Sequence, residues 1–222
     1  TLMDLSDAIS NSSFIKKSNT SLDHDKFTNK FYLDHSEITS EGLFLPETYF
    51  IAKGTTPEML YDMSHKMLIE ELNNQWDNRA PSLPLKSPYE ALILASIIEK
   101  ETAVDDERPR ISSVFIERLK SNMRLQTDPT VIYGLGKDFN GNLTRKDLRT
   151  DTVYNTYTRY GLPPTPISLP SRESIAAALN PSNEKNYYFV ATGDKDGRHK
   201  FSQTIDEHDL AVREYLSKIK AN

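Results

Sequence analysis

The spacing of apolar residues predicts helices over most of the first half of the chain. Leu2, Leu5 and Ile9 recur at helical intervals, which predicts a short helix before residue 11. Between Pro57 and Trp76, apolar residues repeat every three or four positions, which predicts a long amphipathic helix. The proline-punctuated stretch that follows indicates a loop from Asp77 to Lys86.

Residues 87–102 give the clearest local signal. Ser87 suits an N-cap, Pro88 suits the first helical position, and Glu90 completes a capping box. The residues from Ala91 to Ile98 are apolar on nearly every side. A helix of this kind is buried within a protein and does not lie on its surface.

The second half of the chain mixes short helices with strands. The patterns predict a helix over about 107–122, then a loop, short strand and turn over 125–136, and a short helix over 171–179. They also predict one strand at 187–191 and a second strand through His199 and Phe201. A final helix is expected to start at the Thr204–Glu207 capping box and to end near Ile219. Because helices outnumber strands and the strands look antiparallel, we expect a helix-rich α+β fold with a small antiparallel sheet.

The first 40 residues differ from the rest of the chain. They are polar and poorly periodic after the first predicted helix. We therefore expect residues 1–40 to form a peripheral N-terminal segment and residues 41–222 to form the main domain.

Composition excludes several classes of function. The 222 residues include 27 Lys and Arg against 32 Asp and Glu, a formal net charge of −5, which argues against a general nucleic-acid binder. The absence of cysteine excludes disulfides, thiolate nucleophiles and cysteine-ligated metals. The histidines form no metal-binding spacing, so we expect no metal and no cofactor. The chain begins at Thr1 without a signal peptide or an apolar span, so we expect a processed or truncated fragment.

Glu101, at the end of the buried helix, is a candidate general acid. At 100° per residue it lies about 40° from Ile97 and about 20° from Leu94, so it continues the apolar stripe, whereas Glu99 lies about 160° away from it. Burial and the negative end of the helix dipole would both raise its pKa. The alternative is a carboxylate that turns into solvent or pairs with Arg108 or Arg110, and spacing alone favours that alternative.

Polar and aromatic residues later in the chain suit a sugar ligand. Gln126, Thr127 and Asp128 offer donors and acceptors before a proline turn, and Tyr133 is available to stack on a sugar ring. The alternative is that Asp128 caps Thr130 in an Asx turn, which is favoured when this stretch is considered by itself. A second such region runs from residue 154 to residue 167.

Several motifs together identify a family. The chain closely resembles the endolytic murein transglycosylases, or YceG-like family, over roughly residues 40–216. The motifs are Ala-Ser-Ile-Ile-Glu-Lys-Glu-Thr-Ala from residue 95, Arg-Leu-Gln-Thr-Asp-Pro-Thr-Val-Ile-Tyr-Gly from residue 124, Tyr-Asn-Thr-Tyr from residue 154, Gly-Leu-Pro-Pro from residue 161, and the later Asn-Pro and strand segments. Thr165 and Ser171 stand where the family pattern leads us to expect glycine. These two differences affect the expected shape of the local loops and do not affect the expected chemistry.

The resemblance implies one catalytic glutamate, the second of the Glu-Lys-Glu string, which here is Glu101. It implies cleavage of the β-1,4 bond between MurNAc and GlcNAc inside nascent peptidoglycan strands, which leaves 1,6-anhydroMurNAc ends and terminates glycan elongation. Glu101 would act first as acid and then as base. The predicted substrate-binding residues are Gln126, Asp128, Tyr133, Asn155 and Tyr157.

The resemblance also implies a setting. Members are held in the bacterial inner membrane by one N-terminal helix, with the catalytic part in the periplasm, and they often carry a LysM-like subdomain. Residues 1–40 would then be a remnant that follows these missing parts. Peptidoglycan synthases (penicillin-binding proteins) are the implied protein partners.

Two alternatives to a lytic transglycosylase stay open from the sequence. One is a hydrolytic muramidase, which a second essential acid such as Asp128 or Glu47 would favour. The other is a non-catalytic peptidoglycan-binding scaffold.

Overall fold

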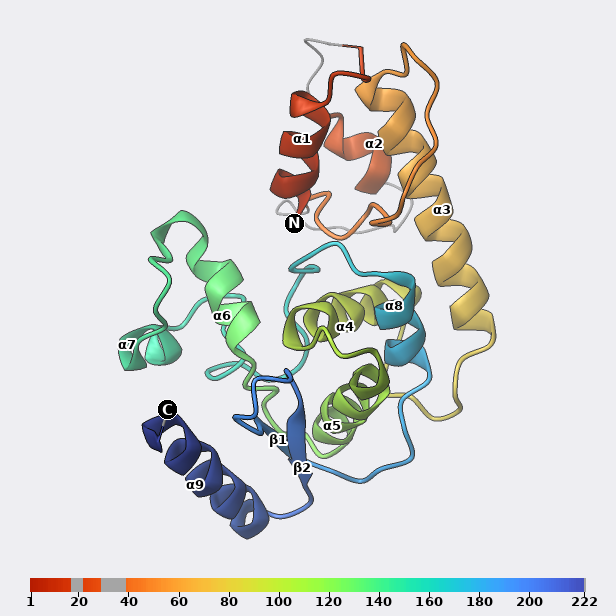
Figure 1. Ribbon diagram of the computed structural model, residues 1–222. Coiled ribbons are helices and arrows are strands. Elements are labelled where there is room, and N and C mark those ends of the chain that lie inside the picture. Colours follow the sequence, from red (N-terminus) through yellow and green to blue (C-terminus); the bar gives the residue numbers. More distant parts are fainter. Residues whose placement is uncertain (17–21, 29–38, 222) are drawn as a thin grey trace.

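The computed structural model describes residues 1–16, 22–28 and 39–221, and within these ranges the chain is mostly helical (Figure 1). Its elements in order are α1 (Leu2–Asn11), α2 (His24–Thr28), α3 (Pro57–Asp77), α4 (Pro88–Glu101), the 3-10 helix η2 (Asp105–Glu107), α5 (Arg108–Lys120), α6 (Asp128–Leu135), the 3-10 helix η3 (Gly136–Asp138), α7 (Arg145–Arg149), α8 (Arg172–Leu179), β1 (Tyr188–Ala191), β2 (His199–Ser202) and α9 (Ile205–Ala221). The predicted α+β class with a small antiparallel sheet is confirmed. None of the described helices is both long and apolar enough to cross a membrane.

Helix α4 is the central element of the main body. It contacts α3, α5, α6 and α8, and Leu92, Leu94 and Ile97 are fully buried on its different sides. The Ser87 hydroxyl accepts the Glu90 N–H as predicted, but the Glu90 carboxylate accepts the N–H of Lys86 at 2.6 Å and not that of Ser87. The prediction of a buried helix over 87–102 is confirmed, and its last residue is Glu101.

The N-terminal elements form their own group at one end of the molecule. Figure 1 shows α1 and α2 beside the first half of α3, away from α5 and the sheet. Phe27 of α2 packs edge-on against buried Phe44 with ring centroids 5.0 Å apart, and Glu41 accepts the N–H of Leu2 at 2.9 Å. Residues after 40 thus take part in this group. The boundary between residues 40 and 41 stays a prediction.

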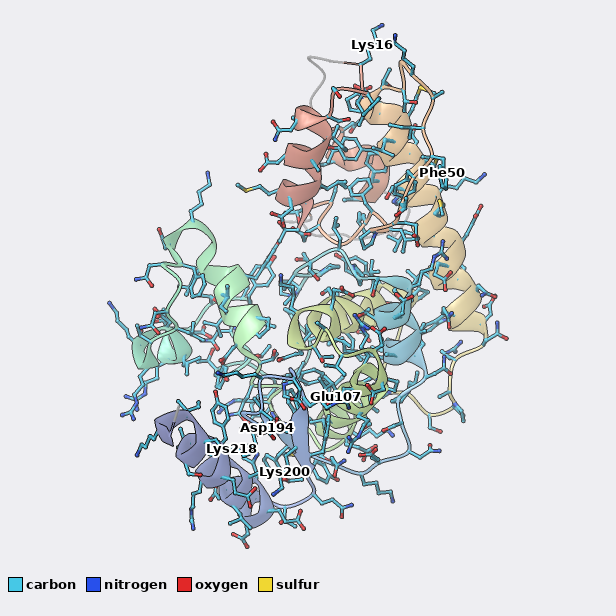
Figure 2. The ribbon with its side chains drawn as sticks, viewed as in Figure 1. Lys16, Phe50, Glu107, Asp194, Lys200 and Lys218 are labelled. Carbon is cyan, nitrogen blue, oxygen red and sulfur yellow. The ribbon has the colours of Figure 1, made fainter. Side chains whose placement is uncertain are left out.

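The sheet is a two-stranded hairpin that α9 covers. β1 and β2 are antiparallel, with Phe189 opposite Phe201. Lys218 of α9 forms an ion pair with Asp194 in the hairpin turn (Figure 2). The Thr204–Glu207 capping box is present at the start of α9, as the sequence predicts.

The prediction of a loop, short strand and turn over 125–136 is wrong. The chain is irregular only as far as Thr127 and then forms α6. The β-branched run from Thr130 to Ile132 favours a strand by intrinsic propensity. Here tertiary packing overrides that weak preference, because Thr130 and Val131 are buried on one side of a helix that Pro129 helps to start.

Candidate active site

Glu101 lies at the carboxyl end of α4 with its carboxyl group enclosed by neighbouring side chains. Burial disfavours the charged form and raises the pKa of this carboxyl from 4.5 to about 7. The elevated pKa expected from the apolar stripe is therefore confirmed. A carboxyl group with such a pKa is protonated in a large fraction of molecules near neutral pH, which a general acid requires.

Four charged or polar groups from different elements act on Glu101. The hydroxyl of Thr127 donates a hydrogen bond to its Oε1, which lowers the pKa. The nearby negative charge of Asp128 raises the pKa, and the positive charge of Arg118, together with that of His199 when its ring is protonated, lowers it. These groups come from the start of α6, from β2 and from α5, so Glu101 lies where the three elements meet.

The predicted alternative for Glu101, pairing with a nearby arginine, is wrong. Arg108 forms its ion pair with Asp105. Arg110 donates two hydrogen bonds to Glu184, at 2.8 and 3.1 Å. Glu101 is thus half-buried and makes no direct ion pair with either arginine.

Glu99 has a structural role on another side of α4. Its Oε2 accepts hydrogen bonds from the Ser171 N–H at 3.0 Å, the Ser171 hydroxyl at 2.6 Å and the Ser174 hydroxyl at 2.6 Å. Although partial burial opposes this, these hydrogen bonds hold the pKa of Glu99 below its ordinary value. Ser171 also caps α8, so the serine found in place of the expected glycine joins α8 to α4.

Thr127, which the sequence offers as a possible donor or acceptor for a sugar, faces Glu101 in the structure. It is the N-cap residue of α6, yet its hydroxyl donates to Glu101 and makes no capping bond to the helix. Its backbone N–H donates to the Thr156 hydroxyl at 3.1 Å, and that hydroxyl also contacts the Thr130 hydroxyl at 2.9 Å. A chain of threonines therefore fixes the donor that faces Glu101. Recognition of α6 in the sequence would have identified Thr127 as an N-cap.

Asp128 and Tyr157 lie together at the edge of the site. Asp128 is exposed, and its Oδ1 accepts a hydrogen bond from the Tyr157 hydroxyl. Burial, followed by this bond to Asp128, raises the pKa of Tyr157, so the phenol stays protonated at neutral pH. The alternative that Asp128 caps Thr130 is wrong, because the Thr130 N–H donates to the Thr127 carbonyl at 3.3 Å.

Gln126 and Asn155 flank this pair in different ways. Gln126 is exposed beside the site and has a positive φ of 50°, an uncommon conformation for a residue other than glycine. Asn155 is fully buried. Its amide donates to three backbone carbonyls, the shortest bond being 2.7 Å to Thr150, and its Oδ1 accepts the Tyr157 N–H at 2.8 Å. Asn155 thus positions the backbone of Tyr157, and its predicted contact with a sugar stays a prediction.

Tyr133 is not brought to Glu101. Its ring packs edge-on against Tyr154 at 4.9 Å between centroids. Tyr133 lines a hollow together with Leu2 and Glu41, so it faces the N-terminal group. Burial and then the charge of Glu41 raise the pKa of its phenol. The Tyr154 hydroxyl meets the Thr165 hydroxyl at 2.8 Å, so this second departure from the family pattern also has a bonding partner.

Arg118 and a Glu107–His199 pair complete the surroundings of Glu101 and were not predicted as functional. Arg118 donates to the carbonyls of Tyr187 at 2.7 Å and Leu125 at 2.6 Å. Buried Glu107 accepts a hydrogen bond from the backbone N–H of His199 at 3.0 Å, and its other carboxylate oxygen is hydrogen-bonded to the His199 Nδ1 at 2.8 Å. In the described ranges, no three His, Asp or Glu side chains converge as metal ligands would.

Three comparisons place the chain among known proteins. A sequence model of the YceG-like family matches residues 1–214. Two similar proteins are named endolytic murein transglycosylase. The one from Bacillus subtilis (strain 168) is 34% identical over 195 residues, which are 87% of this chain and 52% of the relative. The one from Streptococcus pneumoniae (strain D39) is 31% identical over 182 residues, which are 80% of this chain and 32% of the relative.

A solved structure gives the same result for the fold. The crystal structure of a YceG-like protein from Listeria monocytogenes matches with a TM-score of 0.70 and 33% identity, over 95% of this chain and 67% of that one. The chain spans about half the length of the Bacillus relative and about a third of the streptococcal one. With a family match over nearly all of its residues, the chain belongs to the YceG-like family.

Proposed function

We propose that this chain carries the catalytic centre of an endolytic peptidoglycan lytic transglycosylase. The observation that carries the proposal is Glu101, an enclosed carboxyl with a pKa of about 7 that faces a fixed hydroxyl and an exposed carboxylate. The names of the relatives from Bacillus and Streptococcus support the same activity.

The proposed reaction uses Glu101 twice. The protonated carboxyl donates its proton to the oxygen that links MurNAc C1 to the next GlcNAc, and the C1–O bond breaks as an oxocarbenium-like centre develops. The resulting Glu101 carboxylate then takes the proton of the MurNAc 6-hydroxyl, whose oxygen bonds to C1. The products are a 1,6-anhydroMurNAc end and a free GlcNAc 4-hydroxyl, and no water is consumed.

The neighbouring groups suit the two stages of this reaction. While Glu101 is charged, the Thr127 hydroxyl and the positive charge of Arg118 stabilise its carboxylate. The carboxylate of Asp128, held by Tyr157, is placed to stabilise the positive charge at C1. Gln126 offers an exposed amide to sugar hydroxyls next to this pair.

The proposed substrate sets the location and partners of the protein. Peptidoglycan strands lie outside the cytoplasm, so the catalytic part acts in the periplasm or at the outer face of the plasma membrane, held there by an N-terminal anchor. Cleavage inside nascent strands would terminate glycan elongation beside a peptidoglycan synthase, a penicillin-binding protein.

A hydrolytic muramidase is the second candidate function. Asp128 favours it, because this exposed carboxylate lies close enough to Glu101 to raise its pKa, and a glycosidase that uses water needs two carboxyl groups. Glu47 does not favour it. Its carboxylate pairs with Arg172 of α8 at 3.4 Å, in the region where α8 meets α3.

Mass spectrometry of digested peptidoglycan strands tests the proposal. The wild-type chain, Glu101→Gln and the exposed-site control Glu173→Gln are incubated with purified strands under identical conditions. We expect interior fragments that end in 1,6-anhydroMurNAc from wild type and the control, and none from Glu101→Gln. Fragments that end in reducing MurNAc would establish the muramidase instead. Binding of strands by wild type without any cleavage would contradict both enzymes and support a scaffold.

A further inference from the structure

The segment that leads into α6 presents a row of exposed side chains. Leu125 and Thr127 are buried, whereas Arg124, Gln126 and Asp128 between and beside them are exposed. Asp128 acts on Glu101, so one end of the row belongs to the candidate active site. At no more than about 3.6 Å per residue, Arg124 lies within about 14 Å of Asp128 along the chain. A polymer bound over Glu101 that follows this row reaches Arg124.

A loop alongside this segment forms a hollow. The Gln126 N–H donates to the Thr156 carbonyl at 3.2 Å, which joins the two pieces of chain next to Thr127. The hollow has a volume of about 280 Å³ and is lined by Val153, Asn155, Thr156, Arg159, Tyr160, Gly161, Leu162, Pro163 and Pro164. The far end of the loop is fixed to α4, because the Ile167 N–H donates to the Ser96 hydroxyl at 2.9 Å.

Arg124 and Tyr160 meet at the rim of this hollow. The Arg124 guanidinium lies over the Tyr160 ring, 4.8 Å from its centroid, and Tyr160 is 58% exposed. Stacking on an aromatic face holds a planar guanidinium in place while its N–H donors stay free at the edge. These donors suit a planar anion such as a carboxylate.

The charge of Arg124 is not neutralised within the described part of the chain. Arg159, the guanidinium that lines the hollow, donates to both carboxylate oxygens of Asp151, at 3.0 and 2.9 Å. Among the residues that the structure describes, no carboxylate forms such a pair with Arg124. Of these two arginines, Arg124 is the one with its donors available for a ligand.

We propose that Arg124, stacked on Tyr160, binds a carboxylate group carried by the peptidoglycan strand while the strand lies over Glu101. This inference rests on the proposed function. The carboxylate comes from one of two sources: the peptide attached to MurNAc, or the lactyl group of MurNAc once that peptide has been removed. Binding of this group selects strands by what MurNAc carries.

Equilibrium binding to three kinds of strand tests the inference without any requirement for turnover. All proteins carry Glu101→Gln so that no strand is cleaved. The strands bear intact peptides, or bare lactyl carboxylates after amidase treatment, or lactyl groups reduced to neutral alcohols. Arg124→Gln is compared with Arg213→Gln, a matched control that removes an exposed positive charge from α9.

Arg124→Gln should weaken binding of the carboxylate-bearing strands by about tenfold, because a charge-assisted hydrogen bond is lost. Binding of the neutral strands and of every strand by Arg213→Gln should not change. A loss confined to peptide-bearing strands identifies the peptide as the source, and a loss with amidase-treated strands identifies the lactyl group. Equal weakening for all three strands, or no weakening, would overturn the inference.

A second variant and an activity control separate this inference from the proposed function. Tyr160→Leu removes the ring under Arg124 and should produce part of the same selective loss. Failure of wild-type protein to cleave any strand would refute the proposed activity, but a carboxylate-dependent binding difference would still stand. Cleavage by wild type without such a difference would refute only the carboxylate site.

Discussion

Two glutamates near the end of the same helix have opposite environments. Glu99 accepts three hydrogen bonds from α8, and they hold its pKa below the ordinary value despite partial burial. Glu101 accepts a hydrogen bond from Thr127, and burial raises its pKa to about 7. Burial acts to raise the pKa of both carboxyls; the hydrogen bonds from α8 outweigh it at Glu99, whereas the Thr127 hydroxyl does not outweigh it at Glu101. The charged glutamate joins two helices, and the protonated one is available for chemistry.

The largest expected difference between the two glutamates is in cleavage of peptidoglycan. Glu101→Gln removes the proton donor and should lower the rate by about 10³-fold, within the range that general acid–base catalysis contributes. Glu99→Gln should keep the rate within about tenfold of wild type, because Glu99 lies on another side of α4. Initial rates are measured as soluble fragments released, with circular dichroism as a check that each variant is folded. An equal loss in folded Glu99→Gln would refute the separation of roles.

The stability of Glu101→Gln should depend on pH relative to wild type. A carboxyl whose pKa rises from 4.5 to about 7 on folding contributes stability that is fully present below pH 4.5, is lost as the pH rises from 4.5 to about 7, and is absent above that. The quantity of interest is the free energy of unfolding of Glu101→Gln minus that of wild type. This difference should be up to about 3 kcal/mol larger well above pH 7 than at acid pH. Urea denaturation of both proteins at several pH values measures this difference. A difference that does not change with pH would contradict the raised pKa of Glu101.

Glu99→Gln should show a change of the opposite sign. A carboxylate whose pKa is lowered on folding contributes stability above its ordinary pKa, and that stability is lost as the pH falls through the lowered value. Near neutral pH the substitution should cost about 1–3 kcal/mol, because the amide group presents its own N–H to the donors of α8. The same denaturation series should show the cost decreasing on acidification. A cost that persists at acid pH would mean that the charge of Glu99 is not what matters.

The smallest expected effects are shifts in the alkaline limb of the rate profile. The hydroxyl of Thr127 lowers the pKa of Glu101 and the charge of Asp128 raises it. Thr127→Val should therefore move the loss of activity to higher pH, and Asp128→Asn should move it to lower pH. The measurement is the pH dependence of the residual cleavage rate of each variant. Shifts in the same direction would show that the two groups do not act through Glu101.

The sequence predicted the elements whose apolar pattern is strong. The buried helix that ends at Glu101, the long helix over 57–77 and the hairpin with its final helix all follow from periodicity and capping residues. The helical angle between Glu101 and Glu99 also predicted that they lie on different sides of α4, where Glu99 faces α8 and Glu101 faces the start of α6. Periodicity was sufficient in these cases because each of these helices and strands buries one side. The buried side determines both the secondary structure of the element and the surroundings of its side chains.

The sequence did not predict features that depend on tertiary contacts. Helix α6 was missed because its β-branched residues favour a strand until they are packed. With α6 missed, Thr127 was not recognised as a cap residue facing Glu101. Asn155 is as polar as any sugar ligand, and only its burial and its bonds to three carbonyls show that it supports Tyr157.

The most direct test of the two-glutamate account is a titration of the carboxyl groups themselves. Glutamate labelled with carbon-13 at the side-chain carboxyl is introduced into wild type, Glu101→Gln and Glu99→Gln, and the carboxyl resonances are followed by NMR across pH. The account predicts one resonance with a midpoint near pH 7 that is absent from Glu101→Gln and retained in Glu99→Gln. A wild-type spectrum in which every glutamate titrates near its ordinary value of 4.5 or below would contradict it.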